Sequence, residues 1–412
     1  MKVIRYLISA WQKSNLMLRI FLGIVVGAVL ALTMPGYGII SVLGDLFVGA
    51  LKAMAPILVA LLVASSVATA RSGMGVRFRI IIALYILTTL MAAVVAVSAG
   101  FIFPVPIALA DVQGASESAP AALTDVFRNI IAGVMSNPVT AIANANYLSI
   151  LFWAVVIGVA LKKVASKDVI ASLHQWADAV SKVVSWIILC APFGILGLVY
   201  TTVSQSGLEI FSTYGKLLLL LVGCMLAVSL LINPIIVGLM IRRNPYPLVW
   251  HCLKESGVSA FFTRSSAANI PVNMSLCNRM GIDEDFYSVS IPLGSIINMN
   301  GAAITITVMT LATCNTMGVE ISIGSALLIS IIAALAACGA SGVAGGSLLL
   351  IPMACSLFGI GQDIAMQVVA VGFIIGVVQD SVETALNSSG DAIFTIAAEW
   401  SEKIKRGEKI PY

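Results

Sequence analysis

Charged residues are scarce in this chain. Asp, Glu, Lys and Arg make up only 10% of its 412 residues, whereas a soluble protein carries about a quarter. Hydrophobic residues make up 59%. Most of the outer surface must therefore face something other than water, which excludes an ordinary soluble protein. The formal net charge of +4 is small and gives no argument for a nucleic-acid partner.

Histidines and paired cysteines are also scarce. The two histidines, His174 and His251, lie far apart and lack His-x-x-x-His spacing, so a zinc site is not expected. The seven cysteines, Cys190 among them, show no paired spacing and are interpreted as small buried hydrophobes. Residues 1–15 are basic but lack an apolar core followed by a cleavage site. They are interpreted as a retained cytoplasmic segment.

Long apolar runs are what the sequence does contain. Lipid admits only helices and closed barrels, because it cannot satisfy free backbone groups. The runs are continuous rather than alternating, and this pattern favours helices. Clusters of Lys and Arg alternate with stretches poor in positive charge, such as Pro104–Asn146, which is predicted to be an external loop. Crossings are predicted at about 16–34, 42–70, 80–103, 147–163, 180–203 and 213–241. With this even number, both termini are predicted to be cytoplasmic.

Two later apolar segments are interrupted by unusual centres. Val249–Met280 contains the polar stretch Thr263–Asn269, and Ser325–Leu357 contains the glycine-rich stretch Gly339–Ser347. A straight crossing would hardly place an Arg and two Ser at mid-depth. Irregular backbone is tolerated there only when protein or a wet cavity covers it. Each segment is therefore predicted to be a re-entrant hairpin, two half-length helices that meet at a tip.

The two hairpins share a pattern along the sequence. Each tip is followed by Ile-Pro, and a polar helix motif begins 27 residues after Pro271, at Asn298, and 28 residues after Pro352, at Asp380. Paired interruptions at corresponding positions indicate the binding site of a secondary transporter built from inverted repeats. Glycine-rich kinks also serve ordinary helix packing, and that alternative stays open at this point.

The last long helix carries acidic residues on one stripe. At about 100° per residue, a single face presents polar side chains, namely Asp380, Glu383, Thr384, Asn387 and Asp391. Charges in lipid cost several kcal/mol, so this stripe must face protein or water. The alternative is a helix end that reaches the headgroups, and it fits Glu399 and Glu402 better than Asp380. A functional role is favoured.

The segment Gly294–Ala302 holds a second polar interruption. Asn298, Asn300 and Gly301 break an otherwise apolar helix. Backbone carbonyls freed by local unwinding, with amide and carboxylate oxygens, form a hard-oxygen site suited to an alkali cation. The alternative is a polar patch that joins helices by hydrogen bonds.

These motifs together resemble the dicarboxylate/amino acid:cation symporter family, and within it the bacterial sodium/serine–threonine symporters. The resemblance spans the whole chain and includes Tyr85 and Thr88–Thr89 in the third crossing. It implies an all-α polytopic membrane protein with about eight transmembrane helices and two re-entrant hairpins in inverted-repeat symmetry. It also implies a scaffold of early helices over 1–245 that forms a homotrimer, a transport core over 246–400 that moves as an elevator, and a cytoplasmic tail over 401–412.

Site residues follow from the same resemblance. The substrate is expected between the hairpin tips, with Asp380 on its α-ammonium and Thr384 and Asn387 at its carboxylate. The full substrate set is Arg264, Ser265, Ser266, Val343, Asp380, Glu383, Thr384 and Asn387. One Na⁺ is expected at Gly294, Asn298, Asn387 and Asp391. A second Na⁺ is expected at Ile296, Met299, Ala337, Cys338 and Ala340.

Three departures from the family pattern bear on the substrate. Glu383 stands where members that carry acidic substrates have an Arg, and Ala302 stands where they have a Thr. An acidic side chain would meet a like charge. Asn300 replaces an Asp that ligates a further sodium in many members, which puts that ion in doubt. Glu383 is expected either to pair with Arg264 or to point away and be hydrated.

The resulting hypothesis is sodium-coupled import of L-serine and L-threonine across a bacterial inner membrane. Lipid is the surrounding partner, and no organic cofactor is implied. A dicarboxylate or acidic amino-acid symporter driven by sodium or protons is the alternative. A channel is a further rival, which saturable sodium-dependent uptake would distinguish. An intramembrane hydrolase is disfavoured, because no GxSxG elbow, zinc pair or Ser–Lys partner accompanies Ser265, Ser266 or Asp380.

Overall fold

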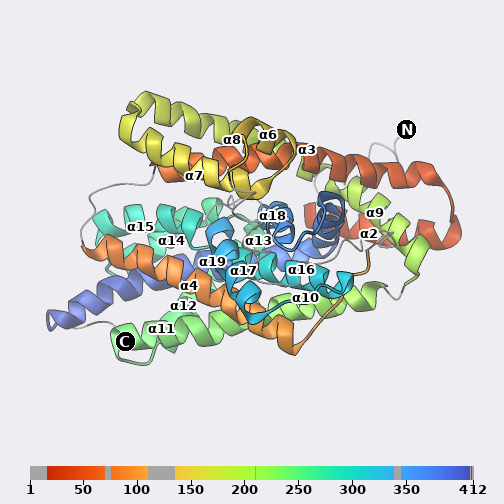
Figure 1. Ribbon diagram of the computed structural model, residues 1–412. Helices are drawn as coiled ribbons and strands as arrows, with labels where there is room; N and C mark the ends of the chain where they lie inside the picture. The colour runs from red at the N-terminus through yellow and green to blue at the C-terminus, as the bar shows by residue number, and fades with distance from the viewer. Residues whose placement is uncertain are drawn as a thin grey trace, which may run out of the picture.

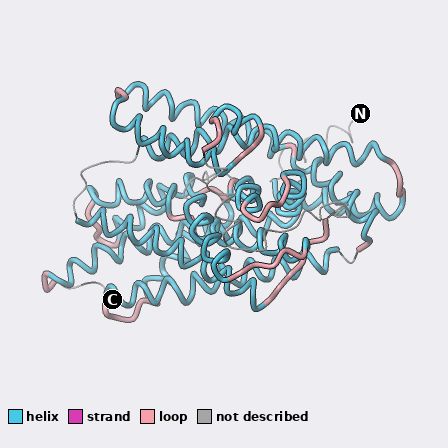
Figure 2. The backbone as a smooth tube through the Cα atoms, in the orientation of Figure 1, coloured by secondary structure: helices cyan, strands magenta, loops and turns pink. Residues whose placement is uncertain are grey.

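Helices make up every regular element of the described chain. The computed structural model describes residues 16–69, 76–109, 135–208, 210–337, 345–408 and 410. Over these ranges it contains helices, turns and loops but no strand (Figure 2). The predicted all-α class is confirmed, as expected for a chain whose backbone must bond internally within lipid.

One group of helices packs around α3. Its members are α2 (Leu16–Thr33), α3 (Gly38–Thr69), α6 (Pro138–Ala143), α7 (Tyr147–Val164), α8 (Lys167–Leu189) and α9 (Ala191–Ser206). Helices α7 and α8 lie alongside α3, and α2 packs along α9 (Figure 1). Glycine permits the closest approach: a Cβ on Gly23 would lie 2.3 Å from the Pro192 carbonyl oxygen. Such small residues let membrane helices pack backbone to backbone.

A second group surrounds the long C-terminal helix. It begins with α4 (Val76–Ile102), α10 (Ile210–Ala227), the π-helix η1 (Val228–Ile232) and α11 (Asn233–Ile241). The first hairpin consists of α12 (Tyr246–Cys252), the π-helix η2 (Leu253–Gly257), α13 (Val258–Thr263) and α14 (Ser266–Arg279). The remaining elements are α15 (Glu284–Ile297), α16 (Asn300–Met317), α17 (Ile323–Ala337), the 3-10 helix η3 (Ser347–Leu350), α18 (Ile351–Ser356) and α19 (Gln362–Lys405).

The early helices α4 and α10 belong spatially to this second group. Helix α4 packs on α16 and α17, and α10 packs on α19 and α16. Both precede residue 245 in the chain, yet their main contacts are with helices that follow it. The division into a scaffold over 1–245 and a transport core over 246–400 stays a prediction.

Five helical segments are long and apolar enough to cross a membrane, and a bent pair raises the number to six among the described residues. The five are Gly38–Thr69, Arg77–Ile102, Phe211–Ile241, Glu284–Met317 and Gln362–Lys405. Helices α2 and α7 cover the predicted crossings at 16–34 and 147–163. The described residues thus contain five or six segments of spanning length, and the expected number of about eight transmembrane helices is not fixed by them.

The predicted crossing at 180–203 falls on two helices rather than one. Helix α8 ends at Leu189, α9 begins at Ala191, and the two are bent by 54°. Pro192 lies in the first turn of α9, where its missing N–H interrupts the preceding helix. Cys190 is exposed at this bend, so its predicted burial is wrong, whereas the other five described cysteines are buried.

Part of the predicted external loop lies outside the described residues. Of Pro104–Asn146, residues 110–134 are not described. The described remainder includes the short helix α6, which Asn137 caps by accepting a hydrogen bond from the Val139 N–H at 2.9 Å. This part of the stretch is therefore partly helical rather than an open loop.

Helices α16 and α19 form the centre of the second group. In α16 every residue from Asn300 to Cys314 is buried, and α19 is buried almost continuously from Gln379 to Trp400. Many of these residues are polar. A polar interior of this kind is expected to mark the functional region of a membrane protein.

Candidate functional site

The first hairpin breaks where the sequence predicted. Helix α13 ends at Thr263, and Arg264 adopts the left-handed conformation with φ of 52°. Ser265 is extended, and its hydroxyl oxygen accepts a hydrogen bond from the Ala268 N–H at 3.2 Å. A left-handed residue ends one helix and a serine N-cap starts the next. The tip therefore separates two distinct helices.

The tip of the second hairpin is described only at its edges. Helix α17 ends at Ala337, and the described chain resumes at Gly345 with φ of +75°. A Cβ on Gly345 would lie 2.9 Å from the ring of Phe373, so glycine permits both the conformation and the close packing. Three predicted ligands lie outside the described residues, namely Cys338, Ala340 and Val343.

The helix break at Asn298 is also confirmed. Helix α15 ends at Ile297, Asn298 and Met299 are not helical, and α16 begins at Asn300. Asn387 on α19 holds the new helix start, because its Oδ1 accepts a hydrogen bond from the Gly301 N–H at 2.7 Å. This contact places the break directly against the polar stripe of α19.

Asp380 connects both hairpin tips to α19. Its Oδ2 accepts a hydrogen bond from Arg264 Nε at 2.7 Å, and its Oδ1 accepts one from the Gly345 N–H at 3.2 Å. The Asp380 side chain is 5% exposed and that of Arg264 is 11% exposed. The expected pairing of Arg264 with Glu383 is therefore wrong, because the guanidinium lies one helical turn earlier along α19.

Glu383 is enclosed by neutral donors instead. Its Oε2 accepts hydrogen bonds from Thr305 Oγ1 at 2.7 Å, Ser347 Oγ at 3.0 Å and Gln379 Nε2 at 2.5 Å. The residue is 6% exposed, so the alternative of a hydrated side chain that points away is also wrong. Buried charge requires such compensation, which neutral donors from three elements supply here.

Thr384 lies between Asp380 and Asn387 on the same stripe. Its hydroxyl donates to the Asp380 carbonyl oxygen of its own helix at 2.7 Å, so both lone pairs of Oγ1 remain as acceptors. Asn387 Nδ2 reaches the sulfur of Met299 at 3.5 Å. The structure thus gathers the predicted substrate residues of α19 with Arg264 of the first tip.

The four residues predicted for the first cation are brought together. Asp391 Oδ1 accepts a hydrogen bond from Asn298 Nδ2 at 2.9 Å, and the same Nδ2 donates to the Asn387 carbonyl oxygen at 3.1 Å. A Cβ on Gly294 would lie 2.7 Å from Asp391 Oδ1. Asp391 Oδ2 is buried and has no partner among the described residues. A buried carboxylate oxygen without a donor fits a hard cation such as Na⁺.

The residues predicted for the second cation are only partly described. Met299 is 3% exposed and Ala337 is fully buried, whereas Ile296 is 38% exposed. The other two members, Cys338 and Ala340, lie outside the described residues. This second site stays a prediction.

Polar partners on other helices were missed by the sequence interpretation. Glu383 accepts hydrogen bonds from Thr305, Ser347 and Gln379. Of these three, only Gln379 could have been predicted from the sequence, because it lies four residues before Glu383 on the same helix face. Asn300, expected at the helix break and as a departure from the family pattern, has its Oδ1 2.9 Å from Thr89 Oγ1. No spacing rule could have found contacts made between distant helices.

A further set of buried hydrogen bonds joins the first hairpin to α19. Asn269 Nδ2 donates to Ser388 Oγ at 2.8 Å and to the Ser256 carbonyl oxygen at 3.2 Å. Asn273 Nδ2 donates to the Ser388 carbonyl oxygen at 2.9 Å. Ser256 belongs to the π-helix η2, a rare element that often occurs at functional sites.

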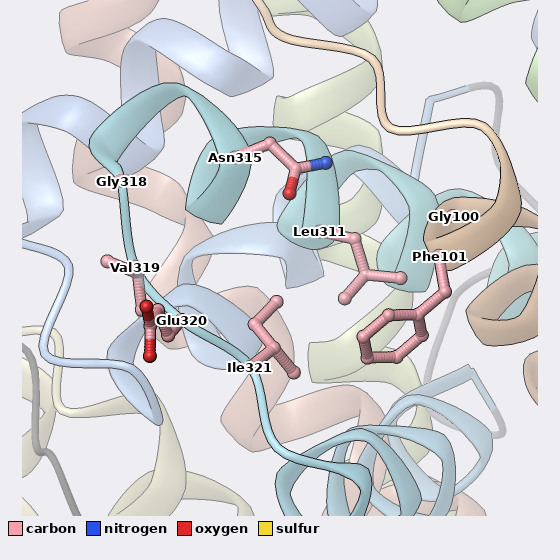
Figure 3. A pocket seen from close by; sticks show the side chains of 8 residues that line it. All are labelled: Gly100, Phe101, Leu311, Asn315, Gly318, Val319, Glu320 and Ile321. Carbon is pink, nitrogen blue, oxygen red and sulfur yellow. The ribbon is translucent and has the colours of Figure 1, made fainter.

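The cavity shown in Figure 3 lies apart from these residues. It has a volume of about 460 Å³ and is lined by the end of α4, the end of α16 and the connection to α17. Asn315 and Glu320 supply its polar side chains, and neither belongs to the predicted substrate or cation sets. The site on α19 is thus distinct from this surface cavity.

Comparison with known proteins agrees with the arrangement of tips, broken helix and acidic stripe. The family model of the sodium:dicarboxylate symporter family matches residues 16–400. The chain belongs to this family. The family assignment made from the sequence is confirmed.

Curated relatives in the family cover nearly the whole chain. The serine/threonine transporter SstT of Bifidobacterium adolescentis is 54% identical over 100% of this chain and 95% of its own. The protein of the same name from Streptococcus thermophilus is 52% identical over 96% of this chain and 98% of its own. The one from Enterococcus faecalis is 54% identical over 98% and 96%. This family member is therefore similar to transporters along its full length.

Proposed function

We propose that this protein imports L-serine and L-threonine together with Na⁺ across the bacterial inner membrane. The observation that carries the proposal is Glu383, a buried carboxylate one helical turn from Asp380 whose described partners are all neutral. An acidic substrate side chain would meet this carboxylate and be repelled. The names of the full-length relatives support the same substrates.

Asp380 binds the substrate α-ammonium in this proposal. A charge-assisted hydrogen bond contributes roughly 1.5–3 kcal/mol. Arg264 and the ammonium are both cations, so both balance the carboxylate when substrate is present. Thr384 and Asn387 bind the substrate carboxylate. The hairpin tips supply further substrate contacts through Ser265, Ser266 and Val343. Asp380→Ala is expected to abolish measurable serine uptake, and near-native serine binding in that variant would contradict this role.

Sodium is the driving ion in the proposal. Asp391 supplies the full negative charge of the first site, with oxygens from Gly294, Asn298 and Asn387, and Ile296, Met299, Ala337, Cys338 and Ala340 form the second. The moving unit is the core after residue 245, which travels as an elevator against a homotrimeric scaffold. The protein is proposed to carry out transport only, with both termini in the cytoplasm.

Uptake by purified protein in liposomes tests the proposal. Labelled serine is measured with and without an inward sodium gradient, and a panel of unlabelled amino acids competes. Serine and threonine should compete well, alanine less well, and aspartate hardly at all. If aspartate competes as well as threonine, the alternative of an acidic amino-acid or dicarboxylate symporter replaces the proposal. Uptake that does not saturate would favour a channel.

A further inference from the structure

The two carboxylate oxygens of Glu383 have unequal surroundings. All three hydrogen bonds of the side chain end at Oε2, and their donors come from α16, η3 and α19. Oε1 accepts none from the residues that the structure describes. A carboxylate has about four acceptor positions, two on each oxygen. Oε2 is therefore saturated, and Oε1 is the oxygen left to accept a further donor.

The hydrogen positions around Oε2 form a consistent set. An ionised carboxylate only accepts, so Gln379 must turn its Nε2 toward Glu383. The second N–H of Gln379 donates to Thr305 Oγ1 at 2.7 Å. The one proton of the Thr305 hydroxyl has two acceptors in reach, the Gly301 carbonyl oxygen at 3.0 Å and Glu383 Oε2 at 2.7 Å, and it goes to the closer, charged one. Thr305, Gln379 and Glu383 thus form a closed triangle with each proton assigned.

Packing fixes the aliphatic part of the Glu383 side chain (the stem) as well as its carboxylate (the head). A Cβ on Gly301 would lie 2.8 Å from Glu383 Cγ and 2.9 Å from its Cα, so the broken helix presses its backbone against this side chain. Thr305 and Gln379 are fully buried and Ser347 is 2% exposed. Because stem and head are both fixed, Oε1 cannot rotate into the place of Oε2 without breaking three hydrogen bonds.

We propose that Glu383 Oε1 accepts the side-chain hydroxyl of serine and threonine, and that Thr305 and Gln379 are positioning residues that hold Oε1 in place. This inference rests on the proposed function and names the group on the substrate that the site recognises. A buried acceptor that is left without its donor loses a full hydrogen bond. The site therefore selects amino acids whose short side chain carries a donor.

The first test compares substrates of equal shape in the wild-type protein. Valine places a methyl group where threonine has its hydroxyl, so the pair isolates the donor. We expect threonine to compete with labelled serine roughly tenfold or more better than valine. Sodium-dependent serine uptake in the same liposomes tests the proposed function separately. Serine uptake with equal competition by threonine and valine would overturn this inference alone.

The second test removes a donor to Oε2 without changing the shape of the helix. Thr305→Val should reduce the preference for threonine over valine at least severalfold, because Glu383 is no longer held, whereas Thr305→Ser should restore it. Thr310→Val is the matched control, since the Thr310 hydroxyl donates to the Ile306 carbonyl of its own helix at 2.7 Å. An unchanged preference in Thr305→Val, with the fold intact, contradicts the positioning role.

The third test reverses the polarity of the recognising atom. In Glu383→Gln the three donors would select the amide oxygen for the inner position and leave Nε2 facing the substrate. O-methyl-L-serine has an ether oxygen but no donor. It should compete with labelled serine much less well than unlabelled serine does in the wild type. This difference in competition between the two compounds, the gap, should narrow severalfold in Glu383→Gln. A gap that stays the same or widens shows that Oε1 does not bind the hydroxyl.

Discussion

Arg264 Nε donates to Asp380 Oδ2 over 2.7 Å, although the two residues are 116 positions apart in the chain. The contact joins the tip of the first hairpin to the middle of α19, and the other oxygen of Asp380 accepts from Gly345 of the second hairpin. One carboxylate therefore joins the tip of the first hairpin and the described edge of the second to α19. Loss of either contact would leave one oxygen of Asp380 without this partner.

Arg264→Gln should lower the melting temperature of the purified protein in detergent. Removal of one partner from a buried ion pair costs about 3–5 kcal/mol, because the other charge stays buried. Arg279→Gln is the control on the same hairpin, since Arg279 pairs with Glu255 but its side chain is 53% exposed. Exposed pairs contribute about 0–1 kcal/mol. Equal melting temperatures for the two variants would show that the pair with Asp380 does not stabilise the fold.

Asp391→Asn should raise the sodium concentration for half-maximal serine uptake by roughly tenfold or more, because it removes the full charge of the first site. Asp391 Oδ2 is buried and has no partner among the described residues. Glu320→Gln, at an exposed carboxylate of the surface cavity, should leave the sodium dependence unchanged. The sodium titration of uptake measures both variants, and an unchanged value for Asp391→Asn removes this residue from the site.

Gly294→Ala should weaken sodium coupling while the first hairpin stays in place. The added methyl would lie 2.7 Å from Asp391 Oδ1 and 2.8 Å from the Tyr85 hydroxyl, closer than real Cβ contacts. Gly223→Ala on α10 is the matched control, since a Cβ there meets no atom within 4 Å. Sodium-dependent tryptophan fluorescence or calorimetry compares the two. Identical sodium affinities would mean that the space beside Asp391 is not used by the ion.

Ser388→Ala should destabilise the protein more than Ser389→Ala. Ser388 Oγ lies 2.8 Å from Asn269 Nδ2 and 3.1 Å from Asn273 Nδ2, so its loss removes a buried acceptor from both amides, at about 1–3 kcal/mol. The Ser389 hydroxyl only donates within its own helix, to the Ala385 carbonyl at 2.6 Å. Thermal denaturation of the neighbouring variants measures the difference, and a reversed order would falsify the role of Ser388.

Local features of the fold could be predicted from the sequence. Apolar runs require helices in lipid, and polar or glycine-rich interruptions end them, as at Arg264 and Asn298. Helical periodicity alone placed Asp380 and Asp391 on one face of α19. The bend at Cys190 was missed, although Pro192 signals a helix start, because the hydrophobic run continues through it.

Partners across the interior were decided only by the tertiary structure. The sequence could show that Arg264 and Glu383 are charged, but not that the guanidinium would reach Asp380 and leave Glu383 to three neutral donors. Thr305 lies 78 residues from Glu383 in the chain, and no periodicity links them. The choice among buried partners depends on how helices cross and which tip lies over which turn, so it follows from packing rather than from spacing along the chain.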